Sequence, residues 1–296
     1  MSYLGGSRKV GYYFVLPFFV GFLVWYLYPI LQSLYLSASQ WNGVGSPRFV
    51  GLGNYTRLLH DPFFYGAIRN TFVIWLISIV PQLFLSLGLA LVLNEKFVRG
   101  KQFFRAVFFF PNIVTPVSIG VLVSLLFNWQ TGTINRVLVS LGIVQHPINW
   151  LGHPLLAQIL VGGVMCWQWF GYNMLLYMAG LQSVPHELID AAQVDGASAW
   201  QIALRVKLPM IRPVLVFTVI TSVIGGMQIF AVPFSLGVGS GPDNSLQTLV
   251  TYLYKQAFTN NQYGYGAAIA VATFVIIAVL SAVSFRLTRD REATAA

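Results

Sequence analysis

Six long stretches of this chain contain no Asp, Glu, Lys or Arg, and they limit the possible fold severely. A helix that crosses a membrane needs about 20 consecutive, mostly apolar residues, and each stretch is long enough to supply one. The expected spans are residues 10–36, 70–93, 106–127, 155–181, 214–236 and 266–287. Residues 37–68 and 128–154 are richer in Gly, Pro, Asn and Gln, which is typical of loops. The sequence therefore predicts an all-α membrane protein with six transmembrane helices.

The composition supports this class. Charged residues make up only 8% of the 296 residues, whereas soluble domains usually carry about 25%. Because so few charges cannot cover a water-exposed surface, most of the surface must face lipid. The first span could instead be a signal peptide, since Arg8 and Lys9 precede it, but its length and its Pro17 and Pro29 favour a retained span.

Lys and Arg are distributed unevenly between the two sides of the expected membrane. One side holds Arg8, Lys9, Lys96, Arg99, Lys101, Arg105, Arg205, Lys207, Arg212, Arg286, Arg289 and Arg291. The other side holds Arg48, Arg57, Arg69, Arg136 and Lys255. Cytoplasmic loops carry the excess of basic residues, so both termini and the loop between spans four and five are expected in the cytoplasm. Because these residues cluster at span ends, the net charge of +9 does not indicate a nucleic-acid partner.

Several chemistries are disfavoured by what the chain lacks. No lysine is followed by Ser or Thr, so the common phosphate-binding loop is missing and another subunit would have to bind ATP. The spans hold no ionisable pair and no histidine, which disfavours proton relay and intramembrane hydrolysis, although backbone carbonyls could still hold an ion. His186 and Asp190 are spaced like helical metal ligands, but the second histidine of that motif is absent. We expect no catalytic residue, metal site or cofactor in this chain, and a buried Cys166.

Uncharged polar and aromatic residues are concentrated in spans four and five. They include Trp167, Gln168, Trp169, Tyr172 and Asn173, and then Thr218, Thr221, Ser222, Gly225, Gly226 and Gln228. In lipid such polar groups lack water partners, so they should face other helices or an aqueous cavity. Two interpretations remain open, namely hydrogen bonding between helices and a pathway for a neutral, hydroxyl-rich solute such as a sugar. A charged solute would need a countercharge, which these spans do not offer.

Residues 186–209, HELIDAAQVDGASAWQIALRVKLP, are charged and contain a glycine, unlike the apolar spans on either side. Pro185 is suited to the start of a helix, and Gly196 to the left-handed conformation in which helices often end. Ser198 and Gln201 have the spacing of a capping box that opens a second helix.

Pro209 is expected to stop this second helix. A stiff pair of short helices with an apolar face and several carboxylates is suited to docking another protein. An amphipathic helix lying on the membrane surface would show the same pattern, so both interpretations remain.

The same segment carries a family signature. Asp190-Ala191-Ala192, Gly196 and Leu208-Pro209 resemble the EAA loop of ABC importer permeases, and the intervals from Ala192 to Gly196 and from Gly196 to Pro209 fit its spacing. Supporting stretches are LPFFVGFLVWYLYPI at 16–30, GLGNY at 51–55, FRAVFFFPNIVTPV at 104–117 and GSGPDNS at 239–245. Over nearly its whole length the chain resembles the carbohydrate branch of these permeases, the maltose-permease type. Asp190 stands where Glu is usual, which keeps the charge and shortens its reach.

The resemblance implies a type I ABC importer permease fold, with residues 1–296 as one transmembrane domain, an importer core at about 66–290 and a coupling loop at 183–212. It implies import of a sugar, a disaccharide or oligosaccharide, through a bacterial or archaeal cell membrane. The implied partners are a second permease, an extracytoplasmic binding protein and two ATP-binding cassette subunits, which would bind ATP and Mg. The implied ATPase-coupling residues are Asp190, Ala191, Ala192, Asp195, Gly196 and Pro209.

The expected substrate pathway consists of Gln168, Trp169, Tyr172, Ser222, Gly225, Gly226 and Gln228. Trp169 stands where the family has a small residue and would narrow the site, while the two glycines would widen it. The same residues could serve another polar solute, such as a polyol or glycerol-3-phosphate, or an ATP-independent carrier. A phosphate would favour a basic residue, and no span interior contains one.

Overall fold

The computed structural model describes the backbone of residues 8–95 and 97–289 and the side chains of 12–95 and 97–286. The predictions that rest on the side chains of Arg8, Lys9, Lys96, Arg289 and Arg291, and on position 290, lie outside the described residues. The chain forms two compact units. One consists of the residues up to Asp61 together with Leu253–Phe274, and the other of Pro62–Tyr252 and the residues from Val275 onward.

The first unit contains a long apolar helix and a small polar subdomain. The helix consists of α1 (Arg8–Phe22), a π-helical turn η1 (Leu23–Leu27) and α2 (Tyr28–Ser37). It is followed by β1 (Ser39–Gln40), β2 (Arg48–Phe49) and α3 (Gly53–Leu59). The two strands are antiparallel, with Ser39 opposite Phe49. The π-helical turn η4 (Lys255–Thr259) and the start of α15 (Tyr263–Arg289) complete this unit.

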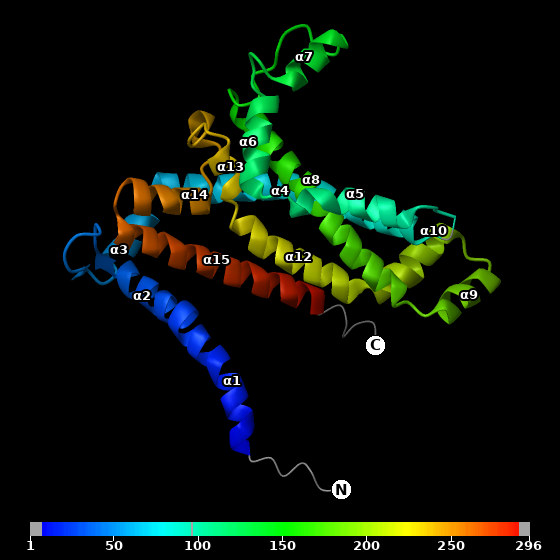
Figure 1. Ribbon diagram of the computed structural model, residues 1–296, viewed down its shortest axis with the longest axis horizontal. Helices are drawn as coiled ribbons and strands as arrows, with labels where there is room; N and C mark the ends of the chain where they lie inside the picture. The colour runs from blue at the N-terminus through cyan, green and yellow to red at the C-terminus, as the bar shows by residue number, and fades with distance from the viewer. Residues whose placement is uncertain (1–7, 96, 290–296) are drawn as a thin grey trace. The chain divides into compact units, whose positions relative to one another are not determined.

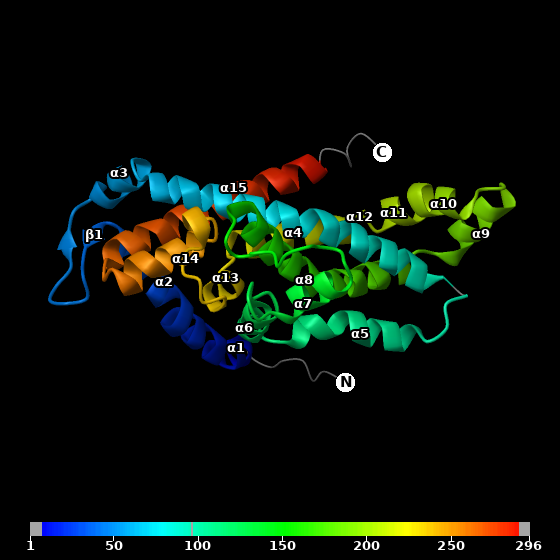
Figure 2. The same cartoon turned by 90° about the horizontal axis from the view of Figure 1, so that it is seen from above.

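The second unit is built around two long helices, α4 (Pro62–Asn94) and α8 (Pro154–Gln182), which run side by side (Figures 1 and 2). Its other elements are α5 (Lys101–Ile113), α6 (Pro116–Leu126), α7 (Thr133–Ser140), α9 (His186–Val194), α10 (Ala199–Ile202), η2 (Ala203–Lys207), α11 (Leu208–Met210), α12 (Arg212–Met227), α13 (Ala231–Ser235), η3 (Pro242–Asn244), most of α14 (Leu249–Tyr254) and the part of α15 from Val275 onward. Helices α5 and α12 both contact α8, and α12 also contacts α4. The short helices α9 and α10 lie at one end of this unit (Figure 1).

Five helices of the described chain are long and apolar enough to cross a membrane, namely Tyr12–Ser37, Pro62–Asn94, Pro154–Gln182, Arg212–Ser235 and Tyr263–Arg286. The pair α5–α6 is a sixth candidate if it forms one broken span. The predicted all-α membrane fold is therefore confirmed. Parts of the segments that we expected to be loops are also structured, because α4 begins at Pro62 and α7 lies within 128–154.

The third span is not the single straight helix expected over 106–127. Helices α5 and α6 meet at an angle of 91°. Val114 and Thr115 are extended at the break, and the Thr115 hydroxyl accepts a hydrogen bond from the Ser118 N–H. Thr115 precedes Pro116, and a residue before proline avoids the helical conformation, which explains why the helix breaks there. The fifth span is also interrupted, since α12 ends at Met227 and α13 begins at Ala231.

The helix that we expected to stop at Pro209 ends one residue later, at Met210. The chain stays helical from Ala199 to Met210, because a π-helical turn precedes the proline. Within that turn the Leu208 N–H bonds to the Ala203 carbonyl, five residues earlier. Proline lacks an N–H and crowds the preceding turn of an α-helix, and a wider turn relieves this conflict. The same arrangement precedes Pro29, where the Tyr28 N–H bonds to the Leu23 carbonyl.

Two apolar cores hold the second unit together. One lies between α4, α6, α8 and α13, with Ile74, Ile119, Val161 and Leu246 almost fully buried. The other lies between α4, α8 and the start of α12, around Met174, Tyr177 and Ile211. The two cores fix α4, α8 and α12 relative to one another, and the polar residues between these helices form the site described next.

Candidate functional site

A cavity of about 320 Å³ lies between α4, α8 and α12 of the second unit. Such a volume is at the lower end of the range of small-molecule sites. Its lining residues are Trp75, Ser78, Gln82, Met165, Trp169, Tyr172, Asn173, Thr218, Thr221, Ser222, Ile224, Gly225 and Gly226. None of them is Asp, Glu, Lys, Arg or His, so the cavity has amides, hydroxyls and aromatic rings but no fixed charge.

Five residues of the expected substrate pathway line this cavity: Trp169, Tyr172, Ser222, Gly225 and Gly226. The other two lie elsewhere. Gln168 is buried and its Nε2 donates to the Val114 carbonyl at 3.4 Å, at the break between α5 and α6. Gln228 follows the last residue of α12 and is not part of the lining.

Helix α4 contributes Trp75, Ser78 and Gln82, which the sequence analysis did not identify. A signal for them exists in the sequence, because Ser78, Gln82 and Ser86 follow one another at intervals of four residues in an apolar helix. This spacing places their side chains on one face of α4. Ser86 donates to the Phe170 carbonyl at 2.8 Å, and thereby holds α8 beside α4.

Trp75 closes one side of the cavity. Its Nε1 donates to the Ser222 hydroxyl at 3.3 Å. A Cβ atom on Gly226 would lie only 1.9 Å from Trp75 Cδ1, so Gly226 leaves room for the indole and does not widen the cavity. Gly225 has no heavy atom within 4 Å of the position of a Cβ, so only Gly225 leaves space open at this point.

Among the lining residues, Asn173 gives the clearest indication of a polar ligand. It is 4% exposed, and its Nδ2 is buried with no hydrogen-bond partner among the described residues. A buried donor without a partner costs free energy, about 1 to 3 kcal/mol, unless a ligand or water supplies the acceptor. A solute hydroxyl in the cavity would satisfy it. Trp169 and Tyr172 pack edge to face at 5.9 Å and present aromatic surface beside it.

The segment between α8 and α12 folds as two short helices around a tight turn. The Ala197 N–H bonds to the Ala192 carbonyl at 2.9 Å, and the Gly196 N–H bonds to the Gln193 carbonyl at 3.0 Å. This is a Schellman motif, which requires a left-handed residue, and Gly196 has φ = +78°. The spacing between Ala192 and Gly196 therefore has a geometric cause.

The second short helix begins as predicted. The Ser198 N–H donates to Gln201 Oε1 at 2.7 Å, and the Gln201 N–H donates to Ser198 Oγ at 3.3 Å, which completes the capping box. The first helix begins at His186, with Pro185 just before it and not inside its first turn. Pairs of short helices capped in this way are stiff, since few backbone groups are left without partners.

Much of this segment is uncovered in the described structure. Helix α9 has no buried residue, and Asp190, Ala191 and Asp195 are exposed while Ala192 is half-buried. Large apolar side chains are also exposed, with Val194 at 88% and Trp200 at 68%. An apolar surface with carboxylates beside it is typical of a protein-docking face.

The base of this segment, by contrast, is firmly anchored. Val184, Ile202 and Ile211 are buried, and two of them belong to the core around Met174. Lys207, whose side chain is 10% exposed, forms an ion pair with Glu95. The base of the segment is therefore fixed to α4, α8 and the start of α12.

Comparisons with known proteins agree with this architecture. The family model described as "Binding-protein-dependent transport system inner membrane component" matches residues 71–291. The chain is 37% identical to the arabinooligosaccharides transport system permease protein AraP of Bacillus subtilis, over 95% of this chain and 89% of the relative. It is 35% identical to the lactose transport system permease protein LacF of Rhizobium radiobacter, over 95% of each chain.

An archaeal relative, the trehalose/maltose transport system permease protein MalF of Thermococcus litoralis, is 30% identical over 96% of this chain and 95% of its own. Among solved structures, a bacterial ABC transporter involved in import of the acidic polysaccharide alginate contains a similar chain. It has a TM-score of 0.84 and 21% identity, and covers 95% of this chain and 96% of that one. This similarity shows that the two chains share the fold of a type I importer permease. The chain belongs to the family of binding-protein-dependent transport system inner membrane components.

Proposed function

We propose that this chain is a membrane-spanning subunit of an ATP-driven importer of a neutral disaccharide or oligosaccharide. The observation that carries the proposal is the cavity between α4, α8 and α12, which is polar and aromatic but uncharged. Amide groups such as that of Asn173 can bond sugar hydroxyls, and Trp169 can pack on the C–H faces of the ring. The lining has no cation for a phosphate, which favours a neutral saccharide over glycerol-3-phosphate.

The relatives support this solute class. Their names refer to arabino-oligosaccharides, lactose and trehalose/maltose, all of which are sugars. The relatives are bacterial and archaeal, which fits a multi-pass protein of a bacterial or archaeal cell membrane. In this proposal the whole chain acts as one permease domain, with an importer core at about 66–290 and a coupling loop at 183–212.

The proposal assigns the coupling role to Asp190, Ala191, Ala192, Asp195, Gly196 and Pro209. The uncovered face of α9 and its anchored base support this role, because a coupling element must contact another subunit and transmit its movement. ATP and Mg would be bound by two separate ATP-binding cassette subunits. A second permease and an extracytoplasmic binding protein complete the assembly, and a related alginate transporter was solved with a substrate-bound periplasmic protein.

Reconstitution of the complete transporter in vesicles tests the proposal. We expect uptake of radiolabelled lactose, trehalose or arabinotriose that requires both ATP and the binding protein. The variant Asn173→Leu should lower uptake about tenfold, because it removes the unpartnered donor from the cavity. The exposed Gln130 of the second unit offers the matched control Gln130→Leu, which should transport normally. Uptake by this chain without ATP would identify a secondary carrier and contradict the proposal.

A further inference from the structure

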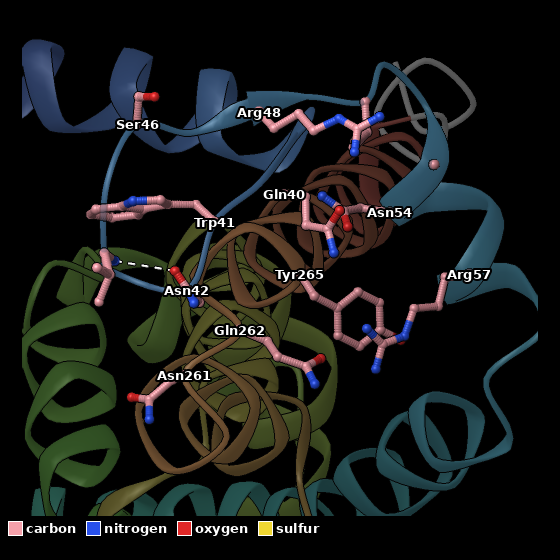
Figure 3. A pocket seen from close by; sticks show the side chains of 13 residues that line it. Gln40, Trp41, Asn42, Ser46, Arg48, Asn54, Arg57, Asn261, Gln262 and Tyr265 are labelled. Carbon is pink, nitrogen blue, oxygen red and sulfur yellow. Dashed lines mark hydrogen bonds between the residues drawn. The ribbon is translucent and has the colours of Figure 1, made fainter.

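A second and larger pocket, of about 560 Å³, lies in the first unit, at its small polar subdomain (Figure 3). It is formed by the β1–β2 turn, α3, the segment that leads into α15 and the first turn of α15. The residues used below are Gln40, Trp41, Arg48, Arg57, Gln262 and Tyr265. Figure 3 shows Trp41 and Asn42 on one side of the pocket and Tyr265 and Arg57 on the other. The distribution of basic residues predicts that this side of the chain is extracytoplasmic.

The walls of the pocket are held in place by specific contacts. Asn54 Nδ2 donates to the carbonyls of Ser37 and Ser39 at 2.9 and 2.8 Å, which ties α3 to the start of β1. Trp41 Nε1 donates to the Gly45 carbonyl at 3.0 Å, and the indole packs on Tyr263 at 5.3 Å. The pocket is therefore formed before any ligand binds, as most small-molecule sites are.

The pocket is rich in hydrogen-bond donors. Arg57 lies 3.9 Å from the centre of the Tyr265 ring, and Tyr265 donates to Asp61, so this guanidinium has a defined position. Arg48 lines the pocket as well, and the lining contains no Asp or Glu. Side-chain amides of Gln40, Asn42, Asn261 and Gln262 face the same space.

One buried acceptor of this pocket has no partner in the part of the chain that the structure describes. Gln262 Oε1 is buried and accepts no hydrogen bond from any described residue. The backbone beside it is fixed, because the Gln262 N–H donates to the Gln256 carbonyl at 2.9 Å. A ligand that fills the pocket should therefore offer a donor to Gln262 and acceptors to the arginines.

We propose that this pocket is a second saccharide-binding site. It holds one monosaccharide residue of a neutral sugar outside the membrane, before the sugar reaches the cavity between α4, α8 and α12. A hydroxyl group both donates and accepts, so it satisfies Gln262 and the arginines together, and the Trp41 ring offers an apolar surface for the sugar. A carboxylate only accepts, so an acidic side chain of a docked protein would leave Gln262 Oε1 without a partner. The inference extends the proposed function, whose solute class it shares.

Fluorine NMR of the complete transporter, labelled with fluorotryptophan and studied without its binding protein, tests the site. The Trp41 resonance is assigned by its loss in Trp41→Phe. We expect lactose, trehalose or arabinotriose to shift this resonance saturably. Gln262→Leu should weaken the response about tenfold, since the hydroxyl loses its buried partner. Gln262→Glu keeps an acceptor at this position, so it should retain the response of the Trp41 resonance. The matched control Gln130→Leu should retain this response as well.

Assembly with the partner subunits, measured by size-exclusion chromatography, verifies that each variant folds. Separate samples receive the acidic trisaccharide trigalacturonate or the binding protein in place of the neutral saccharide. The proposal is overturned if no neutral saccharide shifts the Trp41 resonance, or if only trigalacturonate or the binding protein shifts it. Asn173→Leu, in the cavity of the second unit, should leave the response of the Trp41 resonance to saccharide intact. If this variant lost the response, the pocket would not be a separate site. A Trp41 response without any saccharide uptake would support this pocket and count against the proposed importer.

Discussion

Lys207 Nζ lies 2.8 Å from Glu95 Oε1, which joins the base of the proposed coupling loop to the residue that follows α4. The two residues are 112 positions apart in the chain. Lys207 is nearly buried while Glu95 is 43% exposed, so the ammonium group depends on this carboxylate more than the reverse. The pair gives the coupling loop a direct connection to a helix that lines the cavity.

Breaking this pair from the Glu95 side should be costly. Glu95→Gln leaves the nearly buried ammonium of Lys207 without a counterion, and we expect a loss of about 1 to 3 kcal/mol in the free energy of unfolding. Lys207→Met, which removes the charge and keeps the length, should cost less. Thermal unfolding of the assembled transporter measures both effects, with Glu187→Gln at an exposed position of α9 as the control. Equal stability of Glu95→Gln and the control would show that the ion pair is unimportant.

Gly196→Val should disturb the docking of the cassette subunits and thereby impair coupled transport. A β-branched residue is strained at φ = +78°, so the Schellman turn and the angle between the two short helices should change. Transport and binding-protein-stimulated ATPase activity should fall together, while membrane insertion stays normal. Gly88→Ala is the control, because a Cβ there meets nothing within 4 Å and alanine favours the helix. Coupled transport at the normal rate in Gly196→Val would refute the docking role.

The adjacent glycines of α12 should respond differently to the same change. Gly226→Ala places a Cβ atom 1.9 Å from Trp75 Cδ1, and should displace the indole and break its bond to Ser222. Overpacking of this kind typically costs about 1 to 3 kcal/mol. Gly225→Ala enters open space and should leave stability unchanged. Unfolding curves and the intrinsic fluorescence of the two variants measure this contrast, and similar behaviour of both would contradict the assigned positions.

Trp169→Ala should change the range of transported sugars without loss of assembly. The indole lines the cavity and packs edge to face on Tyr172, so its removal enlarges the site and frees the phenol ring. The effect is measured as competition, in which unlabelled disaccharides and trisaccharides reduce the uptake of the best labelled substrate. Trp25→Ala, at a residue that is 77% exposed in the first unit, is the control. An unchanged substrate panel would leave Trp169 with a packing role only.

Asp190→Asn should lower ATPase coupling without lowering stability. The side chain is exposed on α9, and surface substitutions of this kind usually change the free energy of unfolding by less than about 0.5 kcal/mol. Asp190→Glu, which restores the residue usual in the family, should keep or raise coupled transport. Affinity for the isolated cassette subunits distinguishes the two variants, and equal binding by Asp190→Asn and the unchanged chain would contradict the assigned contact.

Local patterns in the sequence predicted most of the elements. The uncharged stretches located the spans, and the capping box at Ser198 and the left-handed Gly196 were identified from neighbouring residues alone. These features depend on hydrogen bonds and steric limits within a few positions of the chain, so the sequence contains them directly. The stop expected at Pro209 came from a similar local rule, which did not include the π-helical turn that accommodates the proline before the helix ends at Met210.

The composition of the cavity was decided by the tertiary structure. The sequence indicated that Trp169 and Ser222 line the cavity. That Trp75 also lines it, while Gln168 instead bonds to the α5–α6 break, depends on how the helices are rotated against one another. The ion pair between Lys207 and Glu95 likewise depends on how the helices pack. Such contacts join residues far apart in the chain, and packing of whole helices selects them, so no local pattern determines them. The sequence by itself determined the spans and the turn at Gly196, and only the packing of α4, α8 and α12 decided which of their polar residues share one site.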